Sequence, residues 1–327
     1  MATVPLGFNI DAPRWDQSTF VGRLKHFLNI TDPRTVLVPE EELDQAKALV
    51  EGCRAGLVPP GSSREQLLYA KKLYDSAFHP DSGEKMNLIG RMSFQVPGGM
   101  ALTGCMLQFY RTVPAVVFWQ WVNQSFNAIV NYTNRNAASP ISLRQIAVAY
   151  VTATGTALAT AVGLNLYTKV RRAGAGPPLL ARWVPFAAVA AANCVNIPMM
   201  RQQEIINGVV VTDRDNNELG RSRRAAAKGI VQVVVSRIAM AAPGMIILPI
   251  IMERLEKFPF MQRIRVLHGP LQVLLCGGFL LFMVPAACAL FPQRCSLALA
   301  DLELELRDSI MAKHGDKVPY VYFNKGL

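Results

Sequence analysis

Five long gaps between charged residues limit what this chain can fold into. The stretches 92–110, 145–168, 183–200, 238–252 and 266–293 contain no Asp, Glu, Lys or Arg. A water-soluble fold of 327 residues would distribute its charges more evenly, whereas a helix needs about 20 predominantly apolar residues to cross a bilayer. We therefore predict an all-α fold, a polytopic membrane bundle of about five helical spans with an N-terminal soluble helical region.

The predicted bundle occupies 92–293, and its spans are 99–119, 146–167, 183–200, 229–252 and 268–291. Arg111 interrupts the first uncharged region. Because a hairpin cannot turn on a single residue, we interpret that region as one crossing, with Arg111 facing protein or water. In the second span, Gly155, Ala159 and Gly163 recur at four-residue intervals and predict a ridge of small residues that another helix can approach closely.

The regions before and after the bundle have a different composition. Residues 1–91 carry 11 Lys or Arg against 12 Asp or Glu, and we predict a soluble or peripheral helical region there, followed at the other end by a C-terminal tail over 294–327. Apolar spacing predicts helices over 16–28 and 40–54, the first lying either on a membrane surface or on its neighbours. Ser62 and Glu65 predict a capping box for a third helix. The chain start has no leader pattern, so any targeting information is expected to be internal.

The net charge of +11 comes from the bundle, where 18 Lys or Arg stand against 6 Asp or Glu. These cations crowd the short loops between apolar stretches, which favours anionic lipid headgroups as partners and excludes a nucleic-acid groove. The six cysteines form no C-x-x-C pair, so we interpret them as small buried side chains and predict no metal site.

Polar residues at the end of the third span are the first candidate site. Asn193 and Asn196 share a helical face, and Pro198 can release backbone carbonyls beside them. Such a cluster suits a small zwitterion, although the amides could equally bridge neighbouring helices. Arg201 and Arg237 are the candidate ligands for a carboxylate, because arginine pairs well with it and is costly in hydrocarbon.

Two other groups are candidates for gating. Pro243 and Gly244 predict a helix break in the fourth span, as Pro198 does in the third. In the string 79–84, His79, Asp81 and Glu84 could bind a metal or respond to protonation, whereas the simpler interpretation is a turn built by Pro, Asp, Ser and Gly. The asparagines at 123, 127, 131 and 134 form an amide stripe that lines a vestibule or lies at the membrane interface.

The sequence contains no catalytic triad order, nucleotide-binding loop, paired catalytic carboxylates or zinc spacing. We therefore predict a protein that is not an enzyme and has no cofactor.

Several long strings resemble those of one known family, the sideroflexins. They are DAPRWDQSTF (11–20), DSAFHPDSGEKM (75–86), WQWVNQSFN (119–127), NYTNRN (131–136), NCVNIPMMRQ (193–202) and VYFNKGL (321–327). The resemblance covers essentially the whole chain. One departure is Ser82, where the family usually has Thr after His-Pro-Asp; the hydroxyl is retained.

The resemblance implies a multi-pass protein of the mitochondrial inner membrane, with about five spans and no cleaved presequence. It implies that the protein moves serine, and related small amino acids such as alanine, glycine and cysteine, into the matrix for one-carbon metabolism. It also implies a link to iron and haem homeostasis, which we expect to be indirect. The competing hypothesis is a non-transporting membrane scaffold or assembly factor, whose soluble first 91 residues dock a partner and influence iron or haem handling. In either case the expected protein partners are a homo-oligomer or a membrane complex.

Overall fold

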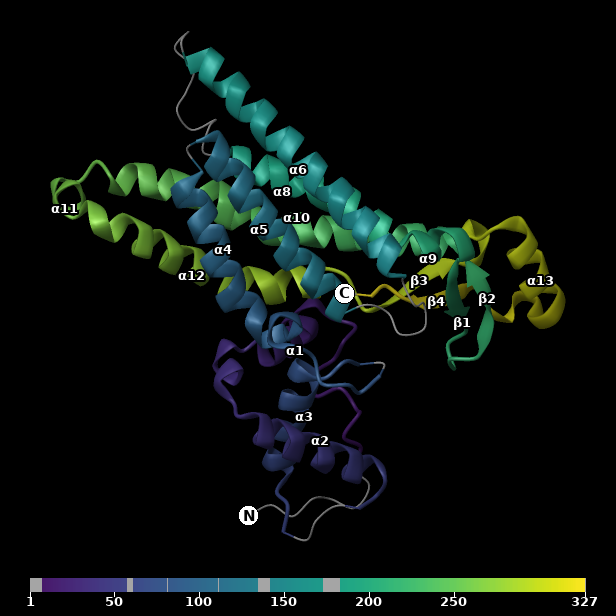
Figure 1. Cartoon of the computed structure of the whole chain (residues 1–327). Helices are drawn as coiled ribbons and strands as arrows, with labels where there is room; N and C mark the ends of the chain where they lie inside the picture. Colours follow the sequence, from purple (N-terminus) through teal and green to yellow (C-terminus); the bar gives the residue numbers. More distant parts are fainter. Residues whose placement is uncertain are drawn as a thin grey trace.

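The structure is a computed structural model that describes residues 8–57, 61–80, 82–110, 112–134, 142–172 and 183–326. Figure 1 shows a bundle of long helices, a helical N-terminal region on one side of it, and a small sheet at one end. The chain is predominantly helical, as predicted. The sheet was not predicted.

Three described helices are long and apolar enough to cross a membrane: α6 over Leu143–Tyr167, α10 (Arg223–Leu255) and α12 (His268–Ala289). A fourth apolar helix, α8 (Val184–Met200), has 17 residues and is therefore about 26 Å long. The hydrocarbon core of a bilayer is about 30 Å thick, so α8 is short for a full crossing. These helices correspond to four of the five predicted spans.

The predicted single crossing over 99–119 is wrong. The chain forms two helices, α4 (Gln95–Phe109) and α5 (Val113–Thr133). They run antiparallel, because the ring of Phe94 lies 6.4 Å from that of Phe126 and the ring of Phe109 lies 6.1 Å from that of Trp119. The signal for the second helix is local: the Thr112 hydroxyl caps its start and Pro114 follows in the first turn. Arg111 lies outside the described residues.

The N-terminal region contains α1 (Phe20–Ile30), α2 (Glu40–Arg54) and α3 (Arg64–Ala77). The capping box of α3 is made by Ser63 and Gln66, one residue after the predicted pair. The region is fixed to the bundle by Arg23, whose Nε donates to the carbonyl of Ala289 at 2.9 Å. This carbonyl ends α12, where a cation is favourable.

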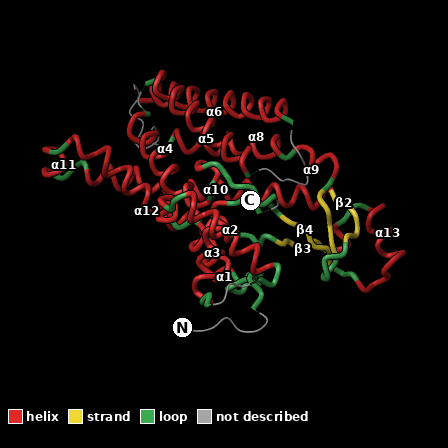
Figure 2. Tube along the Cα trace, turned by 60° about the horizontal axis from the view of Figure 1, so that its bottom comes forward, coloured by secondary structure: helices red, strands yellow, loops and turns green. Residues whose placement is uncertain are grey.

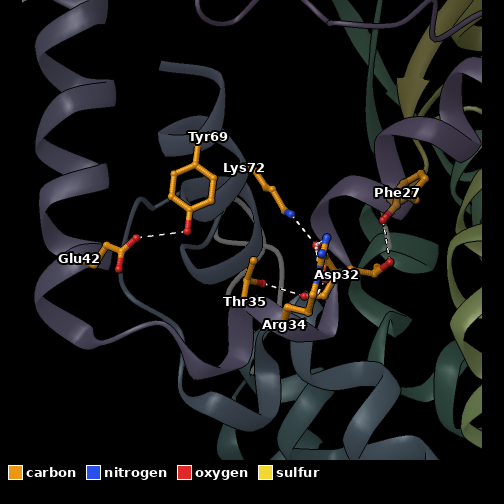
Figure 3. Close-up of polar contacts among 8 residues, drawn as sticks. Phe27, Asp32, Arg34, Thr35, Glu42, Tyr69 and Lys72 are labelled. Atoms are coloured by element: carbon orange, nitrogen blue, oxygen red, sulfur yellow. Dashed lines mark hydrogen bonds and ion pairs between the residues drawn. The ribbon is translucent and has the colours of Figure 1, made fainter. Parts of the chain in front are cut away.

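Asp32 holds the second half of α3 to the segment after α1. Its carboxylate caps the short helix Pro33–Leu37, accepts from Arg34, and accepts from Lys72 Nζ at 2.6 Å. Figure 3 shows the Arg34 and Lys72 side chains pointing to this carboxylate, with the separate contact of Tyr69 and Glu42 beside it. The Asp32 side chain is only 11% exposed, and hydrogen bonds from Arg34 hold its pKa far below the ordinary value of 3.8.

Replacement of Asp32 by Asn should lower the stability of the N-terminal region by about 1–3 kcal/mol at neutral pH, because the buried Lys72 ammonium loses its charged partner. Since the folded-state pKa is depressed, this contribution is present above about pH 4 and is lost as the pH falls below that value. Hydrogen exchange over 33–37 and 64–77 measures the effect. Asp75→Asn, which breaks the i,i+4 pair with Lys71, is the control and should change stability by less than about 0.5 kcal/mol. Equal effects of the two substitutions would contradict this assignment.

Helix α6 (Leu143–Arg172) packs on α8 through alanines rather than through the predicted ridge. Ala149, Ala153, Ala157 and Ala161 are buried at four-residue intervals. The face with Gly155 and Gly163 points away, and no described heavy atom lies within 4 Å of a Cβ built on either glycine. The ridge of small residues therefore remains open on the described surface of the helix.

A close approach of this kind does occur between α4 and α12. A Cβ added to Gly104 would lie 2.8 Å from the Cα of Val273. Gly104→Ala should therefore lower the free energy of unfolding by about 1–3 kcal/mol, measured by detergent titration in mixed micelles. Gly155→Ala is the matched control and should be neutral or stabilising by up to about 1 kcal/mol. A neutral Gly104→Ala would contradict the packing of these two helices.

The predicted helix breaks at Pro198, Pro243 and Gly244 are also wrong. Pro198 lies inside α8, and α10 continues through Pro243 and Pro249. Prolines are tolerated within helices of membrane bundles when neighbouring packing compensates for the missing hydrogen bond. Gly244 is buried and faces Phe279 of α12, which keeps the helices in contact beside Pro243.

A four-stranded sheet pairs two strands that lie between α8 and α10 in the sequence with two strands that follow α12. Its order is β2 (Glu218–Ser222), β1 (Val209–Thr212), β4 (Tyr320–Asn324), β3 (Arg294–Ala298). Its apolar side chains pack with α13 (Leu304–His314) and the start of α10. Residues 294–324 are thus a folded element rather than a tail. Figures 1 and 2 both place the C-terminus in the middle of the molecule, where bundle, sheet and N-terminal region meet.

Candidate functional site

A cavity of about 430 Å³ lies at this meeting point. It reaches from the turn at His79, past the ends of α5, α8 and α12, to the middle of α10 and the last residues of the chain. Its polar lining consists of His79, Gln95, Asn131, Asn134, Arg201, Gln203, Glu204, Arg221, Ser236, Arg237, Gln293, Asn324 and Lys325. A volume of this size is in the range of small-molecule sites, about 300–1,000 Å³.

The lining carries more positive than negative charge. Four of its residues are Arg or Lys, and Glu204 is its one carboxylate among the described residues. Arg221 is exposed at the rim, whereas Arg201 and Lys325 lie deeper. A cavity with this balance attracts anions and carboxylates.

Arg201 and Glu204 neutralise each other. Arg201 follows α8 and caps α9 (Gln202–Asn207), which places the two side chains three residues apart on one turn. Arg201 Nε donates to Glu204 Oε2 at 3.0 Å, and Nη2 donates to the same oxygen. The remaining nitrogen, Nη1, is buried and has no protein partner.

Arg237 lies half-buried on α10 and faces the cavity. Among the described residues, no carboxylate forms an ion pair with it and no hydrogen bond is made to its side chain. Two nearby lining atoms also lack partners: the hydroxyl of Ser236 and the Oε1 oxygen of Gln293. Buried polar atoms are normally satisfied, so this group has capacity for the polar atoms of a ligand.

Lys325, which follows strand β4, is the fourth cation of the cavity lining. It is 2% exposed, and its backbone N–H donates to the carbonyl of Gln293 at 2.8 Å. Burial lowers the pKa of its ammonium below the ordinary value, and the nearby charge of Arg201 lowers it further. No ion pair or side-chain hydrogen bond of Lys325 is present in the described part of the chain.

The described residues of the string 79–84 lie in a turn, which agrees with the simpler interpretation. The N–H of His79 donates to the carbonyl of Glu84, Ser82 N–H donates to His79 Nδ1 at 3.3 Å, and Gly83 has a φ of +66°. His79 is buried and lines the cavity, whereas Glu84 is exposed and Asp81 lies outside the described residues. Among the described residues, no group of three or more His, Cys, Asp or Glu could hold a metal.

The structure brings together only part of the predicted set. His79, Arg201 and Arg237 share the cavity. The amides Asn193 and Asn196 do not line it, nor do Pro198, Pro243 and Gly244. From α8 only Ile197 and Met200, in its last turn, reach the cavity, and the two amides lie before that turn. Asn131 and Asn134 of the amide stripe do line it, which agrees with the vestibule interpretation.

Sequence reasoning missed Lys325, Glu204, Ser236 and Gln293. Glu204 had a signal, since it stands three residues after Arg201. Lys325 had no local signal, because its burial depends on the pairing of β4 with β1, at Thr212 and Tyr322.

A bundle of apolar helices around a partly cationic internal cavity is typical of a membrane protein that binds a small polar molecule. Comparison with known proteins then gives the family. The sideroflexin family model matches residues 9–327. The chain is 73% identical to mouse and human Sideroflexin-2 over 321 residues, 98% of each chain, and 55% identical to human Sideroflexin-1 over 324 residues, 99% of each chain. It belongs to the sideroflexin family. No solved structure matches it.

Proposed function

We propose that the chain is a carrier of the mitochondrial inner membrane that moves serine, and related small zwitterions such as alanine, glycine and cysteine, into the matrix. The observation that carries this proposal is the group of unpaired polar atoms around Arg237 inside the cavity. A carboxylate would neutralise the guanidinium with well-matched geometry. The compartment is proposed on the family resemblance alone.

The other polar atoms suit the rest of a small amino acid. Gln293 Oε1 can accept from an ammonium, and the Ser236 hydroxyl can exchange a hydrogen bond with a serine hydroxyl. The Nδ2 group of Asn134 already donates to the carbonyls of Gly90 and Val130, so only its Oδ1 oxygen could accept a hydrogen bond from a ligand. Ligand binding here would satisfy atoms that the protein leaves unpaired.

Uptake of radiolabelled serine by the purified chain in liposomes tests this function. We expect saturable uptake that excess alanine, glycine or cysteine reduces. Absence of uptake in salt and pH gradients, from protein shown to be folded, would reject the carrier.

The open ridge on α6 favours a second candidate, a membrane scaffold or assembly factor. Gly155, Ala159 and Gly163 are exposed on one face, and small residues at this spacing commonly contact another helix in membranes. A scaffold would tolerate loss of the Arg237 charge, whereas a carrier would not. We propose that any link to iron or haem handling is indirect in either case.

A further inference from the structure

Lys325 is buried without a charged partner, which is unfavourable for folding. Its side chain is 2% exposed, and no described carboxylate lies within ion-pair distance. By contrast Lys72, which is also largely buried, meets Asp32 at 2.6 Å. Removing an ammonium from water costs several kcal/mol unless a partner compensates for it. A buried charge without a partner is better explained by a function than by a contribution to stability.

The backbone fixes Lys325 in place. Strand β4 pairs with β3 up to Asn324, and the next residue donates its N–H to Gln293. The Lys325 Cα approaches α10 at Gly229, where an added Cβ would lie 3.6 Å from it. The sheet and α10 therefore determine where the backbone of Lys325 lies, and the residue does not belong to a loose chain end.

The following residue turns the chain across the cavity. Gly326 has a φ of +76°, and its N–H donates to Asn324 Oδ1 at 3.0 Å. A Cβ on Gly326 would lie 3.4 Å from the Arg201 guanidinium. The last described residues, 324–326, thus line the cavity, as Arg237 of α10 does.

We propose that Lys325 selects substrates by their carboxylate, binding it together with Arg237, and that residues 324–326 form the selecting wall. This inference rests on the proposed function of the same cavity. The guanidinium comes from α10 and the ammonium from the segment after β4, and neither has a carboxylate partner among the described residues. A substrate carboxylate supplies the missing negative charge, so ligands without this group bind much more weakly.

The test compares serine with ethanolamine, which has the same ammonium and hydroxyl groups but no carboxylate. We expect Lys325→Met to raise the KM for serine about 30-fold and to leave inhibition by ethanolamine unchanged, so that the discrimination between the two ligands disappears. Lys325→Arg should restore most of the discrimination. Lys313→Met, at an exposed position of α13, is the control and should behave as wild type. An unchanged KM, or an equal loss for both ligands, would overturn the proposal.

Stability separates this role from a structural one. Because Lys325 has no ion-pair partner to leave unpaired, Lys325→Met should keep or raise the thermal unfolding midpoint. A lowered midpoint together with reduced uptake would show that Lys325 supports the fold, and would also overturn the proposal.

A binding measurement separates failure of this inference from failure of transport. Cys288 lines the same cavity, and its alkylation by N-ethylmaleimide can be followed by mass spectrometry of the detergent-solubilised chain. Serine should protect Cys288 in wild type, and about 30-fold more serine should be needed in Lys325→Met. Protection without uptake would reject the carrier but keep the role of Lys325. If Lys325→Met changed neither uptake nor protection, the carrier would be kept and the role of Lys325 would be rejected.

Discussion

Replacing Arg201 by Met is expected to lower the free energy of unfolding by about 3–5 kcal/mol. The substitution leaves the Glu204 carboxylate, which is 7% exposed, without the guanidinium that now contacts it twice. The double substitution Arg201→Met with Glu204→Met should recover most of the loss, because no unpaired charge then remains buried.

Titration of the chain in mixed micelles with sodium dodecyl sulfate measures these differences. Arg221→Met, at the exposed rim of the same cavity, is the matched control and should change stability by less than about 0.5 kcal/mol. If Arg201→Met proved as stable as this control, or if the double substitution were less stable than the single one, the pair would not be a buried structural contact.

Replacing Arg237 by Met is expected to have the largest effect on transport. The KM for serine should rise about 100-fold, which corresponds to about 2.7 kcal/mol of lost binding free energy. The fold should persist, because no described carboxylate depends on Arg237. Arg237→Lys should retain part of the affinity, since it keeps the charge but loses the two-pronged geometry.

Arg254→Met provides the control for this substitution. Arg254 lies on the same helix but is exposed and outside the cavity, so its KM should match wild type. A KM that Arg237→Met leaves unchanged, in protein that is folded, would remove Arg237 from the binding site and favour the scaffold.

The sequence predicted those features that depend on neighbouring residues, such as helix α2 and the position of Arg237 within an apolar run. The helix predicted over 40–54 is α2 with its observed bounds. Arg237 was found because a charge within an apolar run requires a partner or water. The α4–α5 hairpin was missed, although Thr112 and Pro114 marked the start of its second helix. The single charge of Arg111 between two apolar runs did not indicate a turn.

Long-range packing determined what the sequence could not indicate. Asn193 and Asn196 have the residue types of a zwitterion site, but the fold places only the last turn of α8, with Ile197 and Met200, at the cavity. The burial of Lys325 depends on strand pairing across more than 100 residues, between Thr212 and Tyr322. The same sheet also contains two strands from the predicted C-terminal tail over 294–327, and places residues 324–326 at the cavity.

A structure of the chain determined with bound serine tests the location of the site most directly. We expect serine in the cavity of about 430 Å³, with its carboxylate between Arg237 and Lys325 and its ammonium facing Gln293. Serine bound instead between Asn193 and Asn196, with this cavity empty, would contradict the assignment of the site.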